Sequence, residues 1–188
     1  MTDQPPYPIR TERLLLREFR ETDLDDIHAY GSDEATVRYM EWGPNTPEIT
    51  RKFLDERLAE QAVWPRAHLS FAVELLEEGK VIGATHIALE DHGNAMIGYT
   101  FGSPYWRRGI GYEAAFAMVS KIFDELGGRR VWASCDARNQ GSFAIMEKLG
   151  MRREGTLRQH MPARGGGWRD THVYAVLSDE WASRAGAS

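Results

Sequence analysis

The sequence predicts a single α/β domain (α+β mixed) built on a central mixed, mostly antiparallel sheet. Three strand-like segments are separated by turns of only a few residues, as in an antiparallel meander: 69–76, 81–89 and 95–102. A glycine-containing loop and a helix then lead to a strand at 129–137, which such a crossover makes parallel to the strand before the loop. Two last strands, near 151–159 and 168–177, flank three consecutive glycines and predict a C-terminal hairpin.

The N-terminal part of the chain predicts one strand followed by helices. Residues 13–19 alternate as a strand does, and Thr22 precedes an acid-rich stretch as the N-cap of a helix. Residues 32–42 favour a short second helix, which Gly43-Pro44 ends. Thr46 followed by proline indicates the start of a third helix. One face of that helix is marked by these residues: Ile49, Phe53, Leu54, Arg57, Leu58 and Ala62.

Two later helices are each closed by glycine. Residues 112–126 form the stronger one, which ends at Gly127. Its predicted apolar face consists of Phe116, Val119, Phe123 and Leu126. Residues 139–149 form a shorter helix that ends at Gly150.

The composition is that of an ordinary globular protein. Of 188 residues, 42% are hydrophobic and 27% are charged, which is enough for one domain with a full core. No internal repeat or linker interrupts the chain. We therefore expect one domain over residues 9–182, with flexible ends at 1–8 and 183–188.

Charge and cysteine content exclude several functions. A formal net charge of -5 argues against nucleic acid as a partner and suits a cationic substrate such as an amine. No apolar run is long enough to span a membrane, and the N-terminus lacks a signal-peptide core, so we expect a cytoplasmic protein without a membrane partner. Cys135 is the single cysteine, which excludes an internal disulfide and a cysteine metal cluster.

The loop before the strong helix predicts an anion site. Arg107 and Arg108 run directly into Gly109 and Gly111, which open the helix. Glycine lets the backbone approach a ligand closely, and the first amides of a helix have no internal partner and favour negative charge. Arginines add charge-assisted hydrogen bonds. The expected ligand therefore carries phosphates.

Two other interpretations of this loop exist. Gly109-x-Gly111-x-x-Ala114 fits a dinucleotide-binding turn, with Asp136 at the end of the next strand as the ribose ligand. Against it, a basic and aromatic hexapeptide separates the glycines from the preceding strand, the unit follows a meander, and too little chain remains for a second half. The simpler alternative is a helix start with surface arginines.

Further motifs point to one family. They follow one another along nearly the whole chain: Thr11-Glu12-Arg13-Leu14, Ile97-Gly98-Tyr99, Tyr105 to Ala114, Asn139-x-x-Ser142, Met146 to Met151, and Trp168-Arg169-Asp170. With this set, the chain resembles the GCN5-related N-acetyltransferase (GNAT) superfamily and, within it, the ribosomal-protein (RimJ/RimL-like) type.

The resemblance implies acetyl-CoA as cosubstrate, bound without a metal between splayed strands. The residues that it implies for this cosubstrate lie on the central strand, the glycine loop and the next helix: Ile97, Tyr99, Thr100, Phe101, Arg107, Arg108, Gly109, Ile110, Gly111, Tyr112, Asn139 and Ser142. A backbone amide near Tyr99 or Thr100 would stabilise the oxyanion. The alternative for Asn139 and Ser142 is helix capping.

For catalysis, the simplest mechanism is direct attack of an amine on the thioester. Ser142 would protonate the leaving thiolate. Relatives often carry a glutamate base where this chain has Met96, so Glu41 and His86 are the candidate bases. Cys135 is expected to be a small buried residue and not a nucleophile.

The predicted acceptor is a primary amine, either a protein N-terminus or a small molecule such as a polyamine or an aminoglycoside-like compound. An acceptor groove is expected from Tyr39, Met40 and Trp42 with the loop 164–168. A noncatalytic acyl-CoA-binding module is the alternative in another class, because Met96 cannot take a proton. The resemblance also leaves room for a homodimer.

Overall fold

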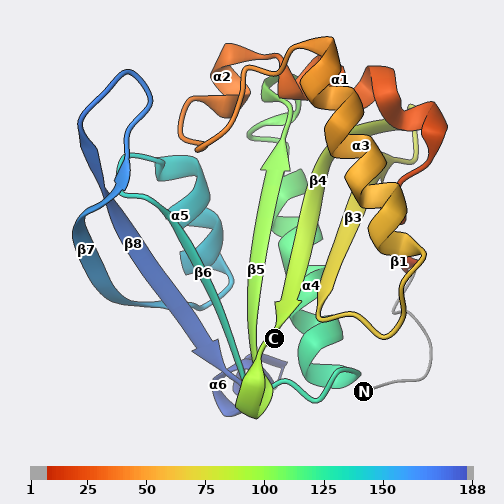
Figure 1. Ribbon diagram of the computed structural model, residues 1–188. Coiled ribbons are helices and arrows are strands. Elements are labelled where there is room, and N and C mark those ends of the chain that lie inside the picture. Colours follow the sequence, from red (N-terminus) through yellow and green to blue (C-terminus); the bar gives the residue numbers. More distant parts are fainter. Residues whose placement is uncertain (1–7, 186–188) are drawn as a thin grey trace.

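Eight strands form one open sheet in the computed structural model, which describes residues 8–185 (Figure 1). The strands are β1 (Ile9–Arg10), β2 (Leu14–Arg17), β3 (His68–Leu75), β4 (Lys80–Leu89), β5 (Asn94–Phe101), β6 (Arg130–Asp136), β7 (Arg152–Pro162) and β8 (Trp168–Leu177). The helices are α1 (Leu24–Gly31), α2 (Glu34–Val37), α3 (Pro47–Gln61), α4 (Ile110–Asp124), α5 (Gln140–Lys148) and α6 (Ser178–Ala185).

The strand order is β1-β2-β3-β4-β5-β6-β8-β7. Neighbours from β1 to β5 run antiparallel, β5 and β6 run parallel, and β6, β8 and β7 are again antiparallel. The predicted meander, the parallel crossover and the C-terminal hairpin are therefore confirmed.

The parallel pair of β5 and β6 is short compared with the length of its two strands. β5 and β6 pair only through Asn94–Met96 and Arg130–Trp132, although both strands continue well beyond. Figure 1 shows them separating toward the top of the view. Along Ile97–Phe101, β5 therefore pairs with β4 on one side and faces an opening on the other.

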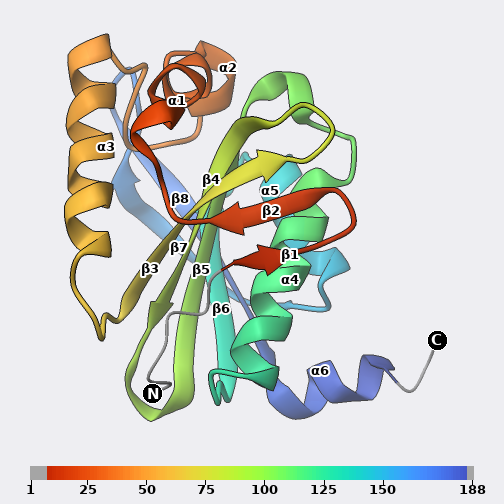
Figure 2. The ribbon, with the colours of Figure 1, turned by 90° about the vertical axis from the view of Figure 1, so that its right-hand side faces the viewer.

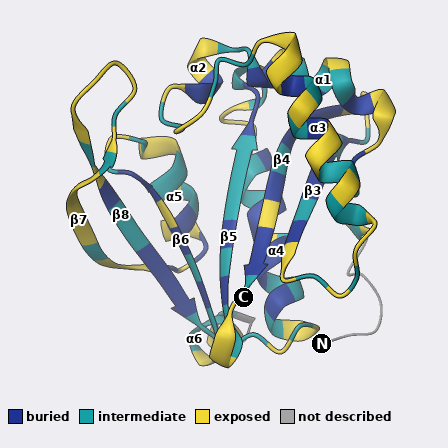
Figure 3. Ribbon diagram, viewed as in Figure 1, coloured by how far each residue is buried: buried dark blue, intermediate teal, exposed yellow. Residues whose placement is uncertain are grey.

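Helices cover both faces of the sheet. Figure 2 shows α1, α2 and α3 on one face and α4, α5 and α6 on the other. Figure 3 shows β3 and β4 as largely buried between them, whereas β7 at the edge is largely exposed. α4 packs on the sheet with six buried side chains: Ile110, Ala114, Ala115, Met118, Val119 and Ile122. The small alanines bring the helix close to the strands.

Several local predictions need correction. Phe116 is 42% exposed and packs on Trp181 of α6, with ring centroids 5.0 Å apart, so the predicted face of α4 is wrong at this residue. Val119 of the same face is buried, and Phe123 and Leu126 pack partly buried against the core. Thr22 is not the N-cap of α1: Asp23 occupies that position, and its carboxylate accepts the Arg20 amide at 2.8 Å. Ile49 is 50% exposed.

Other helix boundaries agree with the sequence. The Thr46 hydroxyl accepts the Ile49 amide, and Asn139 caps α5. Residues 1–7 and 186–188, which make up most of the expected flexible ends, lie outside the described residues, whereas 183–185 continue α6. Within residues 8–185, no helix combines the length and apolarity needed to cross a membrane.

Candidate active site

A cleft of about 1640 Å³ opens where β5 and β6 separate. Its walls come from β4, β5, β6, the glycine loop, α3, α5 and β7. Its lining includes the predicted site residues Tyr99, Thr100, Arg107, Gly109 and Gly111. It also contains Tyr112, Asn139, Ser142, Glu41 and His86. The fold thus brings together residues that lie far apart in the sequence.

The glycine loop turns sharply into α4. Arg107 and Gly109 both have positive φ, of 59° and 78°, and Gly109 is the N-cap of the helix. The first intrahelical bond is made by the amide of Glu113 to Gly109, so the three preceding amides have no intrahelical acceptor. Trp106 fixes the loop to the sheet, because its indole N–H donates to the Phe101 carbonyl at 2.7 Å.

The N-terminal Thr-Glu-Arg segment holds the same helix start. Glu113 in the first turn of α4 accepts hydrogen bonds from the Thr11 hydroxyl at 2.6 Å and from Arg13 at 2.7 Å. Arg13 also donates to the Arg108 carbonyl at 2.9 Å. Burial raises the pKa of Glu113, but these bonds outweigh it and the net pKa falls. The Glu113 carboxylate therefore stabilises the loop through these hydrogen bonds, in addition to its favourable interaction with the helix dipole.

The two loop arginines point to different places. Arg107 lines the cleft. Arg108 instead donates to Glu77 at 2.9 Å and lies over the Tyr105 ring, outside the cleft lining. Lys148 at the end of α5 supplies a cation that the motif did not indicate, and its ammonium lies 4.3 Å from the centre of the Tyr112 ring.

Tyr99 and Ser142 meet across the opening between β5 and α5. The Tyr99 hydroxyl donates to the Ser142 carbonyl at 3.0 Å and lies 3.3 Å from the Ser142 hydroxyl. Burial raises the pKa of Tyr99, so its hydroxyl stays protonated. The Asn139 side chain accepts the Ser142 amide at 3.2 Å, as a helix cap does. Ile97, Phe101 and Ile110 are buried, which leaves only their backbone for a ligand.

His86, on β4, lies on the face of the sheet opposite to the Tyr99 side chain. It pairs with Gly98, and a Cβ added at Gly98 would lie 2.0 Å from the imidazole Cε1, so the ring covers this glycine. The His86 side chain is accessible to solvent where it lines the cleft, and partial desolvation by the cleft walls lowers its pKa from the ordinary value of 6.5. The charges of His68 and Arg57 lower this pKa further. At neutral pH the ring is therefore an uncharged base.

The mouth of the cleft carries paired charges. The Glu41 carboxylate accepts from Arg169 at 2.6 Å. Asp136 is 2% exposed and binds Arg138 through both oxygens, at 2.9 and 2.7 Å. The expected contribution of the loop 164–168 to the groove is wrong, because these residues do not line the cleft. Arg164 reaches the Val37 carbonyl at 3.0 Å instead.

Comparison with known proteins identifies the family. Residues 13–152 match the model of the acetyltransferase (GNAT) domain. The chain belongs to the GNAT acetyltransferase family. An uncharacterized N-acetyltransferase of Bacillus subtilis, YnaD, is 34% identical over 92% of this chain and 98% of its own length. The dinucleotide-binding alternative is therefore wrong.

Solved GNAT structures share the fold. A GNAT-family acetyltransferase from Bacillus anthracis superposes with a TM-score of 0.80 at 33% identity, over 92% of this chain and 99% of that one. RimL, a ribosomal-protein acetyltransferase solved in complex with coenzyme A, gives a TM-score of 0.77 at 21% identity, over 90% and 97% of the two chains. The latter likeness shows the fold alone.

The cysteine of this acetyltransferase is expected to be chemically inert. Cys135 is 9% exposed, and burial raises its pKa to about 11 despite the opposing hydrogen bond from Ser142. A thiol reagent at pH 7 should therefore label the folded enzyme far more slowly than the unfolded chain. Cys135→Ala should retain turnover, as measured by acetyl transfer. Loss of transfer with binding intact would instead indicate a covalent thiol mechanism.

Proposed function

We propose that this GNAT enzyme takes acetyl-CoA as cosubstrate and directs a primary amine to attack its thioester directly. The observation that carries the proposal is the separation of β5 from β6. It places a protonated Tyr99–Ser142 pair on one side of β5 and an uncharged imidazole, His86, on the other. Neighbouring residues of a strand point to opposite faces, so acid and base approach from opposite sides.

The residues around the opening suit a coenzyme A ligand. Unpaired amides at the start of α4, the cationic side chains of Arg107 and Lys148, and glycines that allow close approach suit a pyrophosphate. The free edge of β5 at Ile97–Phe101 suits the amides of a pantetheine arm. The amides, Arg107 and Lys148 therefore supply hydrogen-bond donors and positive charge for a phosphate ligand.

His86 is the base in this proposal. Acetyl-CoA supplies a thioester carbonyl and a thiolate leaving group, and an amine attacks only after losing its proton. The lowered pKa of His86 keeps its ring neutral and able to accept that proton near pH 7. Glu41 is the weaker candidate, because Arg169 already holds its carboxylate.

Ser142 is the acid. As the nitrogen–carbon bond forms, the nitrogen becomes cationic and releases its second proton to water. The carbon–sulfur bond breaks, the Ser142 hydroxyl gives its proton to the sulfur, and it regains one from that water. The Tyr99 hydroxyl holds Ser142 in place through its two contacts. A backbone N–H of β5 near Tyr99 or Thr100 stabilises the charge on the carbonyl oxygen. A cleft of about 1640 Å³ has room for a peptide end or a small amine as acceptor.

The two loop arginines test the cosubstrate site. Arg107→Ala is expected to weaken acetyl-CoA binding about tenfold, because a charge-assisted contact to a phosphate is lost. Arg108→Ala is the matched control, since that side chain pairs with Glu77 and lies outside the cleft lining. Calorimetric titration measures both. Equal losses in the two variants, or no binding by the wild type at millimolar acetyl-CoA, would contradict the proposal.

A further inference from the structure

The acceptor half of the cleft has an apolar wall. We define it as the part lined by residues from the segments 27–60, β3, β4 and β7. Its wall includes Tyr39, Met40, Trp42, Ile49 and Phe53. Trp42 and Ile49 are 41% and 50% exposed although they face the cleft. Large apolar side chains exposed inside a cleft gain burial when an apolar ligand binds.

Every carboxylate that lines the whole cleft, among the described residues, already has an arginine partner. The pairs are Glu41 with Arg169 at 2.6 Å, Glu60 with Arg57 at 2.7 Å, and Asp136 with Arg138 at 2.7 Å. The histidines that line the cleft are His68, His86 and His160. Its balance of charge is therefore neutral to positive within the described residues.

The wall is also held in place from across the cleft. Arg164 of the β7–β8 turn donates to the Val37 carbonyl at 3.0 Å, and Arg138 lies 6.0 Å from the centre of the Tyr39 ring. With the Arg169–Glu41 pair, these contacts tie the segment 37–42 to the far side of the mouth. Figure 1 shows the β7–β8 turn and α2 at the same, upper end of the sheet. Trp42 therefore sits on a fixed segment.

We propose that the acceptor is a monoamine with an apolar body, such as an arylalkylamine or a peptide whose first side chain is apolar. This inference rests on the proposed function and names its substrate class. A second ammonium, as in a polyamine or an aminoglycoside, would be desolvated beside three arginines without an unpaired carboxylate. The body of an apolar monoamine would instead cover Trp42 and Ile49, while its single amine meets His86.

A pair of amines of similar size tests the proposal. Phenylethylamine is expected to exceed diaminobutane by at least about tenfold in kcat/KM for acetyl transfer. A peptide that begins with phenylalanine, assayed alongside, distinguishes a free amine from a protein N-terminus as the source of this chemistry. Preference for diaminobutane or spermidine would overturn the proposal.

Two tryptophan variants localise the effect. Trp42→Ala is expected to lower kcat/KM for phenylethylamine about tenfold and to change that for diaminobutane little. Trp168→Ala is the matched control, because Trp168 is 63% exposed and does not line the cleft. Equal effects of the two variants would overturn the assignment of the wall.

Binding separates this inference from the proposed function. Calorimetric titration of phenylethylamine into the CoA-saturated protein should show binding that Trp42→Ala weakens. If no amine is acetylated but this binding is observed, the proposed function fails, whereas the assignment of the wall as a binding site for an apolar monoamine stands. If amines are acetylated but phenylethylamine binds no better than diaminobutane, the acceptor class fails alone.

Discussion

Replacing His86 with glutamine is expected to lower kcat for acetyl transfer by about 100-fold or more, because a positioned general base contributes on that order. Glutamine fills similar space over Gly98 but cannot take the proton of the amine. Steady-state rates of CoA release at saturating acetyl-CoA and amine measure the loss. The affinity for acetyl-CoA, measured by titration, should stay unchanged.

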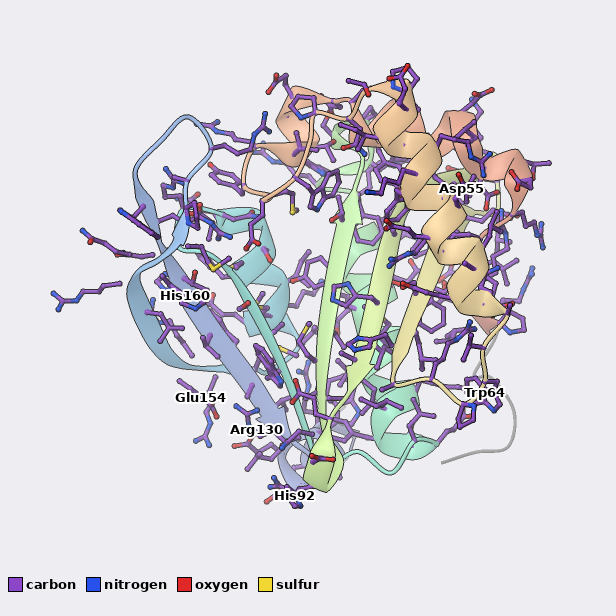
Figure 4. All side chains as sticks on the ribbon, viewed as in Figure 1. Asp55, Trp64, His92, Arg130, Glu154 and His160 are labelled. Carbon is purple, nitrogen blue, oxygen red and sulfur yellow. The ribbon has the colours of Figure 1, made fainter. Side chains whose placement is uncertain are left out.

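His92→Asn is the matched control. His92 lies in the turn before β5 with a φ of 61°, a conformation that asparagine tolerates, and Figure 4 shows it at the end of the sheet away from the cleft mouth. Its replacement should leave kcat unchanged. Equal rates in wild type and His86→Gln would show that another group, or water, removes the proton.

The pH profile follows from the same residue. Because partial desolvation lowers the pKa of His86 below 6.5, the acid limb of kcat/KM should lie below pH 6.5. The unfolded chain binds a proton at His86 more readily than the folded protein does. The contribution of His86 to the free energy of unfolding therefore decreases as the pH falls. That contribution is fully present above pH 6.5 and is lost as the pH falls toward the folded pKa.

Replacing Asp23 with alanine is expected to lower the free energy of unfolding by about 3 kcal/mol, because the buried Arg17 guanidinium loses one of its two carboxylate partners and keeps only Glu74, at 2.7 Å. Arg17 and Asp23 have side chains only 8% and 4% exposed, and they share two hydrogen bonds of 2.8 and 2.9 Å. Asp23 also accepts the Arg20 amide, so the turn before α1 loses this hydrogen bond as well. Thermal unfolding should show a fall in Tm on the order of 10 °C.

Asp55→Ala is the matched control for that variant. Asp55 pairs with Arg51 on the surface of α3, with 60% of its side chain exposed (Figure 4). A surface pair of this kind contributes less than about 1 kcal/mol, so Tm should barely change. Similar losses in both variants would show that the Arg17–Asp23 pair stabilises the fold no more than a solvated one does.

The parts of the fold that local signals define could be predicted from the sequence. Alternating strands with short turns, Thr46-Pro47 and Gly150 each act within a few residues, and the strands and helices that they predict are present. The place of Phe116 on α4 could not be predicted in this way. Phe116 is covered by Trp181, which reaches it only because α6 folds back after β8.

The site shows the same division. The motifs correctly predicted that Arg107, Gly109 and Ser142 line one cleft. The path of the chain from β5 through α4 and β6 to α5 places these residues close together. The pairing of Arg108 with Glu77 and of Glu41 with Arg169 depends on contacts between segments 31 and 128 residues apart. No local pattern signals such contacts. The sequence could therefore suggest Arg108 and Glu41 as site residues, but it could not predict that each is held in an ion pair.

The central claim is amine-dependent acetyl transfer from acetyl-CoA without an acetylated enzyme. The most direct test follows CoA release from acetyl-CoA with and without phenylethylamine, together with mass spectrometry of the amine and of the protein. We expect CoA release to depend on the amine and to equal the amount of N-acetylated product, while the enzyme stays unmodified. Release that no amine accelerates, or an enzyme acetylated before the amine is added, would contradict it.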